Sequence, residues 1–519
     1  MDATETQLDP RRWWTLAVLC LSLLMVILGN TVLNVAIPTL IRVLEASDRD
    51  VQWMVDAYSL VFAGLLFTAG ALGDRFGRKG ALNVGLVVFG LGSLFAALGD
   101  GTTEIITGRA IMGIGAALVM PSTLSILTNV FPPHERARAI GMWAGVAGAG
   151  GAIGPITSGF LLEHFWWGSI FFLNLPVVVL ALVSGYFLVP TSRDPDQARL
   201  DFLGAGLSIG AISSLVYGII EAPQRGWLDG EILGAFGLAV VFGALFAWWE
   251  LRNREPMLDL RYFRRRGFSG GSIAVSMMFF GMFGMFFLMT QYLQLVKGWS
   301  ALSTGVRTLP FAFTMMVTAP SSARIAEKLG TRTTVCTGIG VAALGFVVMS
   351  QAGVQTSYWY IALALVVLAA GMGLTMAPST ASIMASLPLG KAGIGSAMND
   401  TNRELGGALG IAVLGSILVS RYTSGLDAAL RGFPEAVQDA ARSSLGGAIG
   451  VAGPDSPLAA AAREAFSDAF SGVLLIAAAV VAVAGVLVWR IMPQHLGESE
   501  VQPRHGGDEV DSDEEPVPA

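Results

Sequence analysis

The sequence predicts an all-α polytopic membrane protein, and three observations support this prediction. Of its 519 residues, 53% are hydrophobic and only 13% are charged, whereas soluble domains average about 25% charged residues. Apolar runs recur along the chain, and many approach the roughly 20 residues that a helix needs to cross a bilayer. The 64 glycine residues suit helices that approach one another closely in a membrane.

Fourteen apolar segments are predicted to span the membrane, and they form three groups. The first six are residues 13–40, 51–72, 81–99, 104–128, 138–162 and 168–189. Two more follow at 201–221 and 231–250. The last six are residues 268–296, 303–325, 332–352, 358–385, 394–420 and 467–491. The first run is too long for a removable signal peptide, so we count it as a span.

These groups predict how the chain is divided. An N-terminal tail at 1–12 precedes a six-helix bundle at 13–190, and two inserted helices with their loops occupy 191–267. A second six-helix bundle covers 268–491 and includes a long external loop at 421–466. The tail at 492–519 is acidic and is expected to be disordered, because it has little apolar surface to bury.

The distribution of positive charge predicts the orientation. An even number of spans places both termini on one side of the membrane. Most Lys and Arg residues of the predicted loops also fall on that side, including the cluster at 261–266. By the positive-inside rule, both termini are expected in the cytoplasm.

The loop GALGDRFGRKGAL at 70–82 joins the second and third predicted spans. Its glycines permit a tight turn with close backbone approach. The residues expected to act here are Gly70, Asp74, Arg75, Gly77, Arg78 and Lys79. Because the loop is cytoplasmic, its charges are expected to latch the cytoplasmic ends of the two bundles.

A repeat indicates that the two six-helix groups are related. AEKLGTR at 326–332 is a weaker copy of the loop at 70–82. PSTLSI at 121–126 is matched by PSTASI at 378–383, and GGAIG at 150–154 by GGALG at 406–410. Three matches in the same order favour an internal repeat, with the helices at 201–250 inserted between the halves.

Two single charges lie inside predicted spans, where ionisable residues are costly and are candidates for function. Asp56 is close to the outer end of the second span, so it is either a functional carboxylate or a residue of the membrane boundary. Arg109 lies near the start of the fourth span. It either takes part in coupling or neutralises a carboxylate or backbone carbonyl groups.

The strongest candidate is GSAMNDTNRELGGALG at 395–410. Asp400 and Glu404 are separated by one helical turn and share a face, and Arg403 can neutralise either of them. An ion-paired packing cluster is the alternative. Three charges exceed what packing requires, so we expect a functional site. A buried carboxyl group exposed alternately to each side of the membrane could carry a proton.

The glycine-rich fifth span completes the set of candidate residues. Gly150 and Gly154 permit a close helix crossing, and Pro155 is expected to bend the helix. The sequence contains no phosphate-binding P-loop, no cluster of metal-ligand residues and no nucleophile–histidine pair. We therefore expect no enzymatic activity, no ATP-driven transport, no cofactor, no metal and no nucleic-acid partner.

These motifs resemble those of the major facilitator superfamily. Residues 70–82 are similar to its loop signature G-x-L-a-D-r-x-G-r-k. Arg109 and Gly113 resemble its R-x-x-q-G motif, with Met112 in place of the usual glutamine. Residues 150–155 resemble the motif of its antiporters, which implies export.

The resemblance extends to one branch, the 14-span drug:proton antiporters of the QacA/EmrB type. WGSIFFLNLP at 167–176 and NDTNRELGGALG at 399–410 are similar to that branch. One position departs from it: the branch usually carries an aspartate in the first helix, where this chain has Gly29. If that aspartate carries protons in relatives, this chain must use other carboxylates, such as Asp56, Asp400 and Glu404.

The resemblance implies a multi-pass transporter of the bacterial inner membrane, monomeric in the bilayer. It would exchange protons for small amphipathic, cationic drugs by alternating access, with the path between the two bundles. Two alternatives remain open. One is a dedicated exporter of a self-made lipid, siderophore or antibiotic, and the other is a sensor that keeps the fold without transport.

Overall fold

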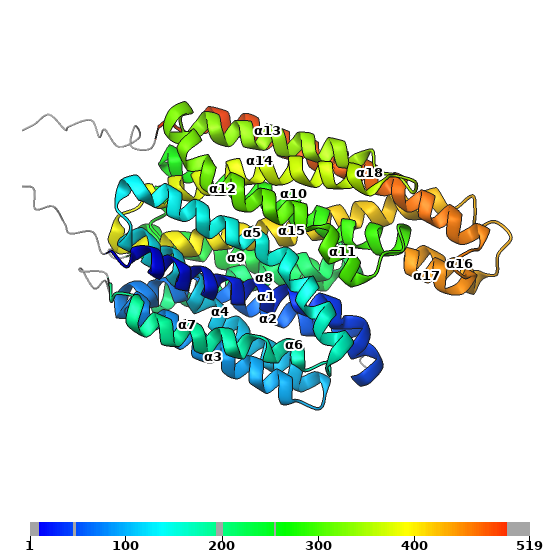
Figure 1. The fold of residues 1–519 in the computed structure, drawn as a ribbon, viewed down its shortest axis with the longest axis horizontal. Helices are drawn as coiled ribbons and strands as arrows, with labels where there is room; N and C mark the ends of the chain where they lie inside the picture. The colour runs from blue at the N-terminus through cyan, green and yellow to red at the C-terminus, as the bar shows by residue number, and fades with distance from the viewer. Residues whose placement is uncertain (1–9, 45–47, 194–200, 254–255, 496–519) are drawn as a thin grey trace, which may run out of the picture.

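The computed structural model describes residues 10–44, 48–193, 201–253 and 256–495. Every regular element in these ranges is a helix, which confirms the predicted all-α fold. Long helices lie side by side along the longest axis of the molecule (Figure 1). The start of α1 and the end of α18 lie at one end of the bundle, opposite the short helices α16 and α17.

The N-terminal half contains seven helical segments, and the inserted pair follows it. The first half consists of α1 (Arg12–Leu44), α2 (Asp48–Phe76), α3 (Arg78–Leu98), α4 (Thr102–Val130), α5 (Pro133–His164), α6 (Ser169–Phe172) and α7 (Asn174–Leu188). The inserted helices are α8 (Phe202–Arg225) and α9 (Gly230–Arg252). The short helix η1 (Leu260–Arg264) follows them and precedes the second half.

The C-terminal half repeats this arrangement with more interruptions. Its helices are α10 (Arg266–Gln291), η2 (Tyr292–Val296), α11 (Ala301–Arg307), α12 (Leu309–Leu329), α13 (Thr331–Ser350), α14 (Tyr358–Ala385), η3 (Leu389–Lys391), α15 (Ala392–Leu426), α16 (Glu435–Ser443), α17 (Leu445–Ala452) and α18 (Pro457–Ile491). In Figure 1 the two halves occupy opposite sides of the molecule.

The number of spans differs from the prediction. Among the described residues, 13 helices are long and apolar enough to cross a membrane. The predicted span at 303–325 is not one of them: the chain breaks between α11 and α12, and α12, although 21 residues long, is not apolar enough to be counted. The second half of α12 also carries Pro320, serines and Arg324, which lower its hydropathy. The polytopic fold is confirmed, but the count of fourteen is not.

The predicted loop at 421–466 also differs in detail from the structure. α15 continues to Leu426 and α18 begins at Pro457, so the predicted loop at 421–466 is shorter in the structure and contains α16 and α17. The hydroxyl group of Tyr422 donates to the carbonyl of Ala441 at 3.0 Å, which ties α16 to α15.

Two seams join the halves. At the first, α5 packs against α12, and a Cβ atom added to Gly141 would lie 2.6 Å from the carbonyl oxygen of Ala319. At the second, α2 and α4 pack against α15, and a Cβ atom added to Gly70 would lie 2.6 Å from the carbonyl oxygen of Gly393. Glycine therefore permits direct backbone contact between the halves at both seams.

The inserted helices cover the second seam. α8 packs against α2 and α15, one helix from each half, and α9 packs against α8. The indole of Trp227, in the α8–α9 turn, donates to the hydroxyl of Ser416 on α15 at 3.2 Å. Leu238, Val240 and Val241 of α9 are exposed, as expected for a surface that faces lipid.

Candidate functional site

A buried ion pair occupies the turn between α2 and α3. Gly77, at the turn, has a φ of 113°, a conformation that residues with a Cβ atom rarely adopt. This turn directs Arg78 back toward Asp74. The Nε and Nη2 atoms of Arg78 donate to Oδ1 of Asp74 at 2.9 and 2.7 Å. Asp74 is 3% exposed and Arg78 is 1% exposed. Such a pair must be closely matched, because a buried charge without a partner costs several kcal/mol.

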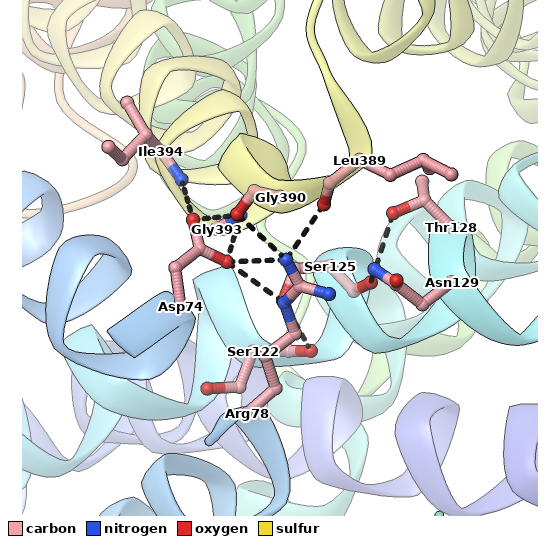
Figure 2. A network of polar contacts seen from close by, with 10 residues as sticks. All are labelled: Asp74, Arg78, Ser122, Ser125, Thr128, Asn129, Leu389, Gly390, Gly393 and Ile394. Atoms are coloured by element: carbon pink, nitrogen blue, oxygen red, sulfur yellow. Dashed lines mark hydrogen bonds and ion pairs between the residues drawn. The ribbon is translucent and has the colours of Figure 1, made fainter. Parts of the chain in front are cut away.

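Both members of this pair also bind the other half of the protein (Figure 2). Asp74 accepts hydrogen bonds from the N–H groups of Gly393 at 2.9 Å and Ile394 at 3.2 Å. These are free donors in the first turn of α15, where a negative charge is favoured. Arg78 donates to the carbonyl oxygens of Leu389 at 2.8 Å and Gly390 at 3.1 Å. We refer to these six residues as the latch.

The remaining charges of the loop contact their own half. Lys79 donates to the carbonyl oxygen of Tyr186, near the end of α7, at 2.8 Å. The guanidinium of Arg75 lies 5.3 Å from the ring of its neighbour Phe76. Of the four charges expected to act together, the structure brings only two to the opposite half.

Three charged residues of α15 lie within about one turn near the middle of the helix bundle. Asp400 is 1% exposed and Arg403 is 8% exposed. Arg403 Nη1 lies 3.6 Å from Asp400 Oδ1, and the amide of Asn399 donates to the same oxygen at 3.5 Å. The second oxygen, Oδ2, has no hydrogen-bond partner within the described residues. One carboxylate oxygen of Asp400 is therefore buried without a hydrogen bond from the described part of the chain.

Arg403 also lies close to two aromatic rings, one from each half. Its guanidinium carbon is 4.8 Å from the ring centre of Phe279 on α10 and 5.6 Å from that of Trp143 on α5. Both rings are buried. A cation over the face of a desolvated aromatic ring gains about 2 kcal/mol. The rings thus provide part of the stabilisation that the single long ion pair does not.

Arg109 is fully buried and is held mainly by backbone. Its Nε donates to the carbonyl oxygen of Met54 at 2.9 Å, and its Nη1 donates to that of Gly29 at 2.5 Å. Its guanidinium stacks over the ring of Tyr58 at 4.3 Å, and Asp56 interacts with it electrostatically. Arg109 therefore ties α1 and α2 to α4 through carbonyl groups, one of the two structural roles considered from the sequence.

Tyr58 is a buried neighbour of Arg109 that the sequence does not point to. The guanidinium carbon of Arg109 lies 4.3 Å from the centre of its ring. The Tyr58 hydroxyl donates to the carbonyl oxygen of Val26 at 3.3 Å. Glu404 of α15 lies within electrostatic range of this phenol, so the charged turn of α15 is near this part of the first half.

The space at Gly29 is filled by apolar side chains. A Cβ atom added there would lie 2.6 Å from the ring of Phe89 and 3.2 Å from the methyl group of Met112. Gly29 and Met112, the two departures from the superfamily motifs, are therefore neighbours in space. A carboxylate does not fit at position 29 unless Phe89 moves.

The glycines of α5 serve two contacts. Cβ atoms added to Gly150 and Gly154 would collide with Ile27 and Thr31 of α1, in the same half. Gly141 and Gly148 approach α12 of the other half. Pro155 lies within α5, but its side chain is outside the described part of the structure. Among the described residues, no group of three or more His, Cys, Asp and Glu side chains is placed to hold a metal ion.

The family follows from a comparison with known proteins. The family model described as Major Facilitator Superfamily matches residues 19–411. The chain belongs to the major facilitator superfamily. Solved superfamily structures agree in fold: the proton:xylose symporter XylE has a TM-score of 0.60 at 13% identity, covering 93% of this chain and 96% of that one.

Curated members of the superfamily resemble this chain over nearly their whole length. Multidrug efflux pump LfrA of Mycolicibacterium smegmatis is 36% identical, with 93% of this chain and 97% of the relative covered. Multidrug resistance protein Stp of Mycobacterium tuberculosis is 32% identical, with 94% of each covered. Methyl viologen resistance protein SmvA of Salmonella typhimurium is 34% identical, with 92% and 98% covered. The protein is therefore a multi-pass membrane protein of a transporter family, as predicted.

Proposed function

We propose that this protein exports amphipathic, cationic compounds in exchange for protons. The observation that carries the proposal is the charged turn of α15, where Asp400, Arg403 and Glu404 lie at the boundary between the halves. Ionisable groups in such a position are costly in a bilayer and are kept for ion or substrate binding. The similarity to the multidrug efflux pump LfrA, the multidrug resistance protein Stp and the methyl viologen resistance protein SmvA supports drugs as the exported class.

Coupling follows from competition for the same carboxyl groups. Asp400 and Glu404 lie one turn apart, and a cationic compound and a proton can each neutralise them. A proton that arrives from outside releases the compound, and loss of that proton to the cytoplasm restores the site. Arg403 keeps the empty site close to neutral, which lowers the cost of crossing the membrane without cargo.

The latch would supply the alternating access. Asp74 and Arg78 hold the first half against η3 and α15, so the path is closed on that side while the latch is formed. Release of the latch would open the cytoplasmic side as the halves rock at the α5–α12 seam. The α2–α3 turn lies at the same end of the bundle as the start of α1 and the end of α18, and we propose that this end faces the cytoplasm of a bacterial cell with the inner membrane as its location. We propose that a monomer suffices.

The test is ethidium transport by the purified protein in liposomes under an imposed pH gradient. Wild type should move ethidium against its gradient, and Asp400→Asn and Glu404→Gln should each reduce the initial rate at least about tenfold. A matched control is Asp427→Asn, at an exposed ion pair with Arg442 on the external surface. Unchanged transport in both α15 variants would overturn the site assignment.

A dedicated exporter of one natural product is the second candidate. The Tetracenomycin C resistance and export protein of Streptomyces glaucescens is 36% identical over 412 residues, with 79% of this chain and 77% of the relative covered. Competition assays separate the candidates. A multidrug exporter should have its ethidium transport inhibited by several unrelated cations, whereas a dedicated exporter should respond to one chemical type.

A further inference from the structure

Arg403 is a buried cation with unusually weak polar contacts. A guanidinium has five N–H donors, yet within the described residues Arg403 forms one ion pair, at 3.6 Å, and no shorter hydrogen bond. Arg109, by contrast, donates to carbonyl groups at 2.5 and 2.9 Å. Polar contacts therefore hold the guanidinium of Arg403 less firmly than that of Arg109.

The rings around Arg403 are fixed more firmly than Arg403 itself. The indole N–H of Trp143 donates to the hydroxyl of Thr123 at 3.2 Å, and that hydroxyl donates to the carbonyl oxygen of Met120 at 2.8 Å. Phe279 packs edge-on against Phe283, with ring centres 5.3 Å apart. Both rings are therefore held by contacts that do not involve Arg403.

The internal repeat places two equivalent threonines near the charged turn of α15. Thr123 belongs to PSTLSI, and Thr380 occupies the same place in PSTASI. Thr123 orients Trp143, while Thr380 donates to Asn399 at 3.0 Å, and Asn399 in turn donates to Asp400. One half therefore orients a ring beside Arg403, and the other half orients the carboxylate that pairs with it.

This site lies near the middle of the membrane. From Ala392 to Arg403, α15 rises about 16 Å at 1.5 Å per residue, about half of the roughly 30 Å hydrocarbon core. Trp143 belongs to the first half, whereas Phe279 and Arg403 belong to the second. The pair of rings can enclose a cation only while the halves are together at this depth.

We propose that Trp143 and Phe279 form the recognition site for the positive charge of the exported compound, and that Arg403 occupies this site until the compound displaces it. The inference rests on the proposed export function. Guanidinium is planar, delocalised and weakly hydrated, and it stacks on aromatic faces. The exported compounds would share these properties: they are flat aromatic cations with a delocalised charge.

The exchange also accounts for neutrality in the loaded state. When a cation takes the place between the rings, Arg403 moves toward Asp400 and the neighbouring Glu404. The number of positive charges at the rings stays the same in both states. Trp143 and Phe279 thus act as specificity-determining residues, and Arg403 acts as an internal competitor of the compound.

Ethidium binding to the purified full-length protein tests this exchange. Trp143→Leu should weaken ethidium binding about tenfold, as expected for the loss of a desolvated cation–π contact. Trp143→Phe keeps an aromatic face and should stay within about threefold of wild type. Trp13→Leu is the matched control, since the guanidinium of Arg138 lies 5.2 Å from the ring centre of Trp13 near the start of α1. Ethidium binding by this variant should equal that of wild type.

The distinguishing result comes from Arg403. If Arg403 competes with the compound, Arg403→Gln alone should tighten ethidium binding about fivefold or more relative to wild type. In a protein that already carries Trp143→Leu, the same substitution should tighten binding much less. An equal gain in both backgrounds would mean that only net charge matters, and it would overturn the proposal. Wild-type affinity in a folded Trp143→Leu protein, or no saturable ethidium binding by wild type, would also overturn it.

Failure of this inference is separable from failure of the proposed function. Gradient-driven ethidium transport that depends on Asp400 but not on Trp143 would leave proton-coupled export standing and remove the ring site. Ethidium binding that depends on Trp143, without any transport under a pH gradient, would leave the ring site standing and remove proton-coupled export.

Discussion

The α2–α3 loop of the first half and the α12–α13 loop of the second share one turn geometry but have different partners. Gly77 in the first loop has a φ of 113°, and Gly330 in the second has a φ of 85°. The first loop binds η3 and α15 of the opposite half through Asp74 and Arg78. The second loop binds Gln494, which lies just beyond α18 in the same half. The N–H of Thr331 donates to the carbonyl oxygen of Gln494 at 2.6 Å, and the side-chain amide of Gln494 donates to the carbonyl oxygen of Leu329 at 2.7 Å.

The comparison shows how a repeated motif acquires two roles. Both loops reverse the chain between adjacent helices, and both need glycine at the turn. Among the described residues, the first loop bonds across the boundary between the halves and the second bonds within its own half, so we expect the first to respond when the halves separate at this end. We call the second arrangement, Leu329, Thr331, Arg332 and Gln494, the C-terminal clasp.

The largest effect is expected from Asp74→Ala. The change leaves Arg78 buried without its partner, which costs about 3–5 kcal/mol in the closed state. A cysteine at Ser122, beside the latch in Figure 2, should then react at least about tenfold faster with a membrane-impermeant thiol reagent applied from the cytoplasm. The background would carry Cys20→Ser and Cys336→Ser. Glu327→Ala, in the second loop, is the control and should leave the reaction rate unchanged.

Gly70→Ala should have the next largest effect. Its Cβ atom would lie 2.6 Å from the carbonyl oxygen of Gly393, and such overpacking typically costs about 1–3 kcal/mol. The cysteine at Ser122 should become several-fold more reactive. Gly80→Ala is the matched control in the same loop, because an added Cβ atom there meets nothing within 4 Å. Equal reactivity in the two variants would contradict the close α2–α15 contact.

Gln494→Ala should separate the clasp from the latch. Its side chain donates to Leu329 at 2.7 Å and accepts from Arg332 at 3.1 Å. Loss of these hydrogen bonds should lower the unfolding midpoint of the purified protein by a few degrees, at about 1 kcal/mol per bond. The reactivity of the cysteine at Ser122 should not change. A rise in that reactivity would show that the second loop also controls the cytoplasmic opening.

Lys79→Ala should have the smallest effect. Within the described residues, its ammonium group donates one hydrogen bond, to the carbonyl oxygen of Tyr186 in the same half, and lies 5.5 Å from the centre of that residue's ring in an exposed setting. We expect the rate of ethidium transport to stay within about twofold of wild type, as for other surface charge contacts. A loss comparable to that of Asp74→Ala would place Lys79 in the latch.

The sequence carries the parts of this architecture that depend on local pattern. Hydrophobic runs located the helices to within a few residues for most spans, and the repeat separated the two halves. The break between α11 and α12 was missed because the apolar run continues through it. Proline near the start of a helix, as at Pro310, is compatible with either a break or a continuous span.

The partners of the candidate residues depend on contacts that local pattern does not encode. Asp74 and Arg78 were singled out from the sequence, but their bonds to Gly393 and Leu389 join segments far apart in the chain. Trp143 and Phe279 lie in apolar helices where an aromatic residue is ordinary. Their role becomes visible only when α5, α10 and α15 meet around Arg403.

The most direct test of the difference between the loops uses two pairs of spin labels in the protein reconstituted in lipid. One pair, at the exposed residues Phe76 and Leu389, spans the latch; the other, at Leu329 and Trp489, lies within the second half beside the clasp. Addition of ethidium should produce a longer distance for the first pair and leave the second unchanged. Movement of both pairs together, or of neither, would contradict a latch that opens while the clasp stays closed.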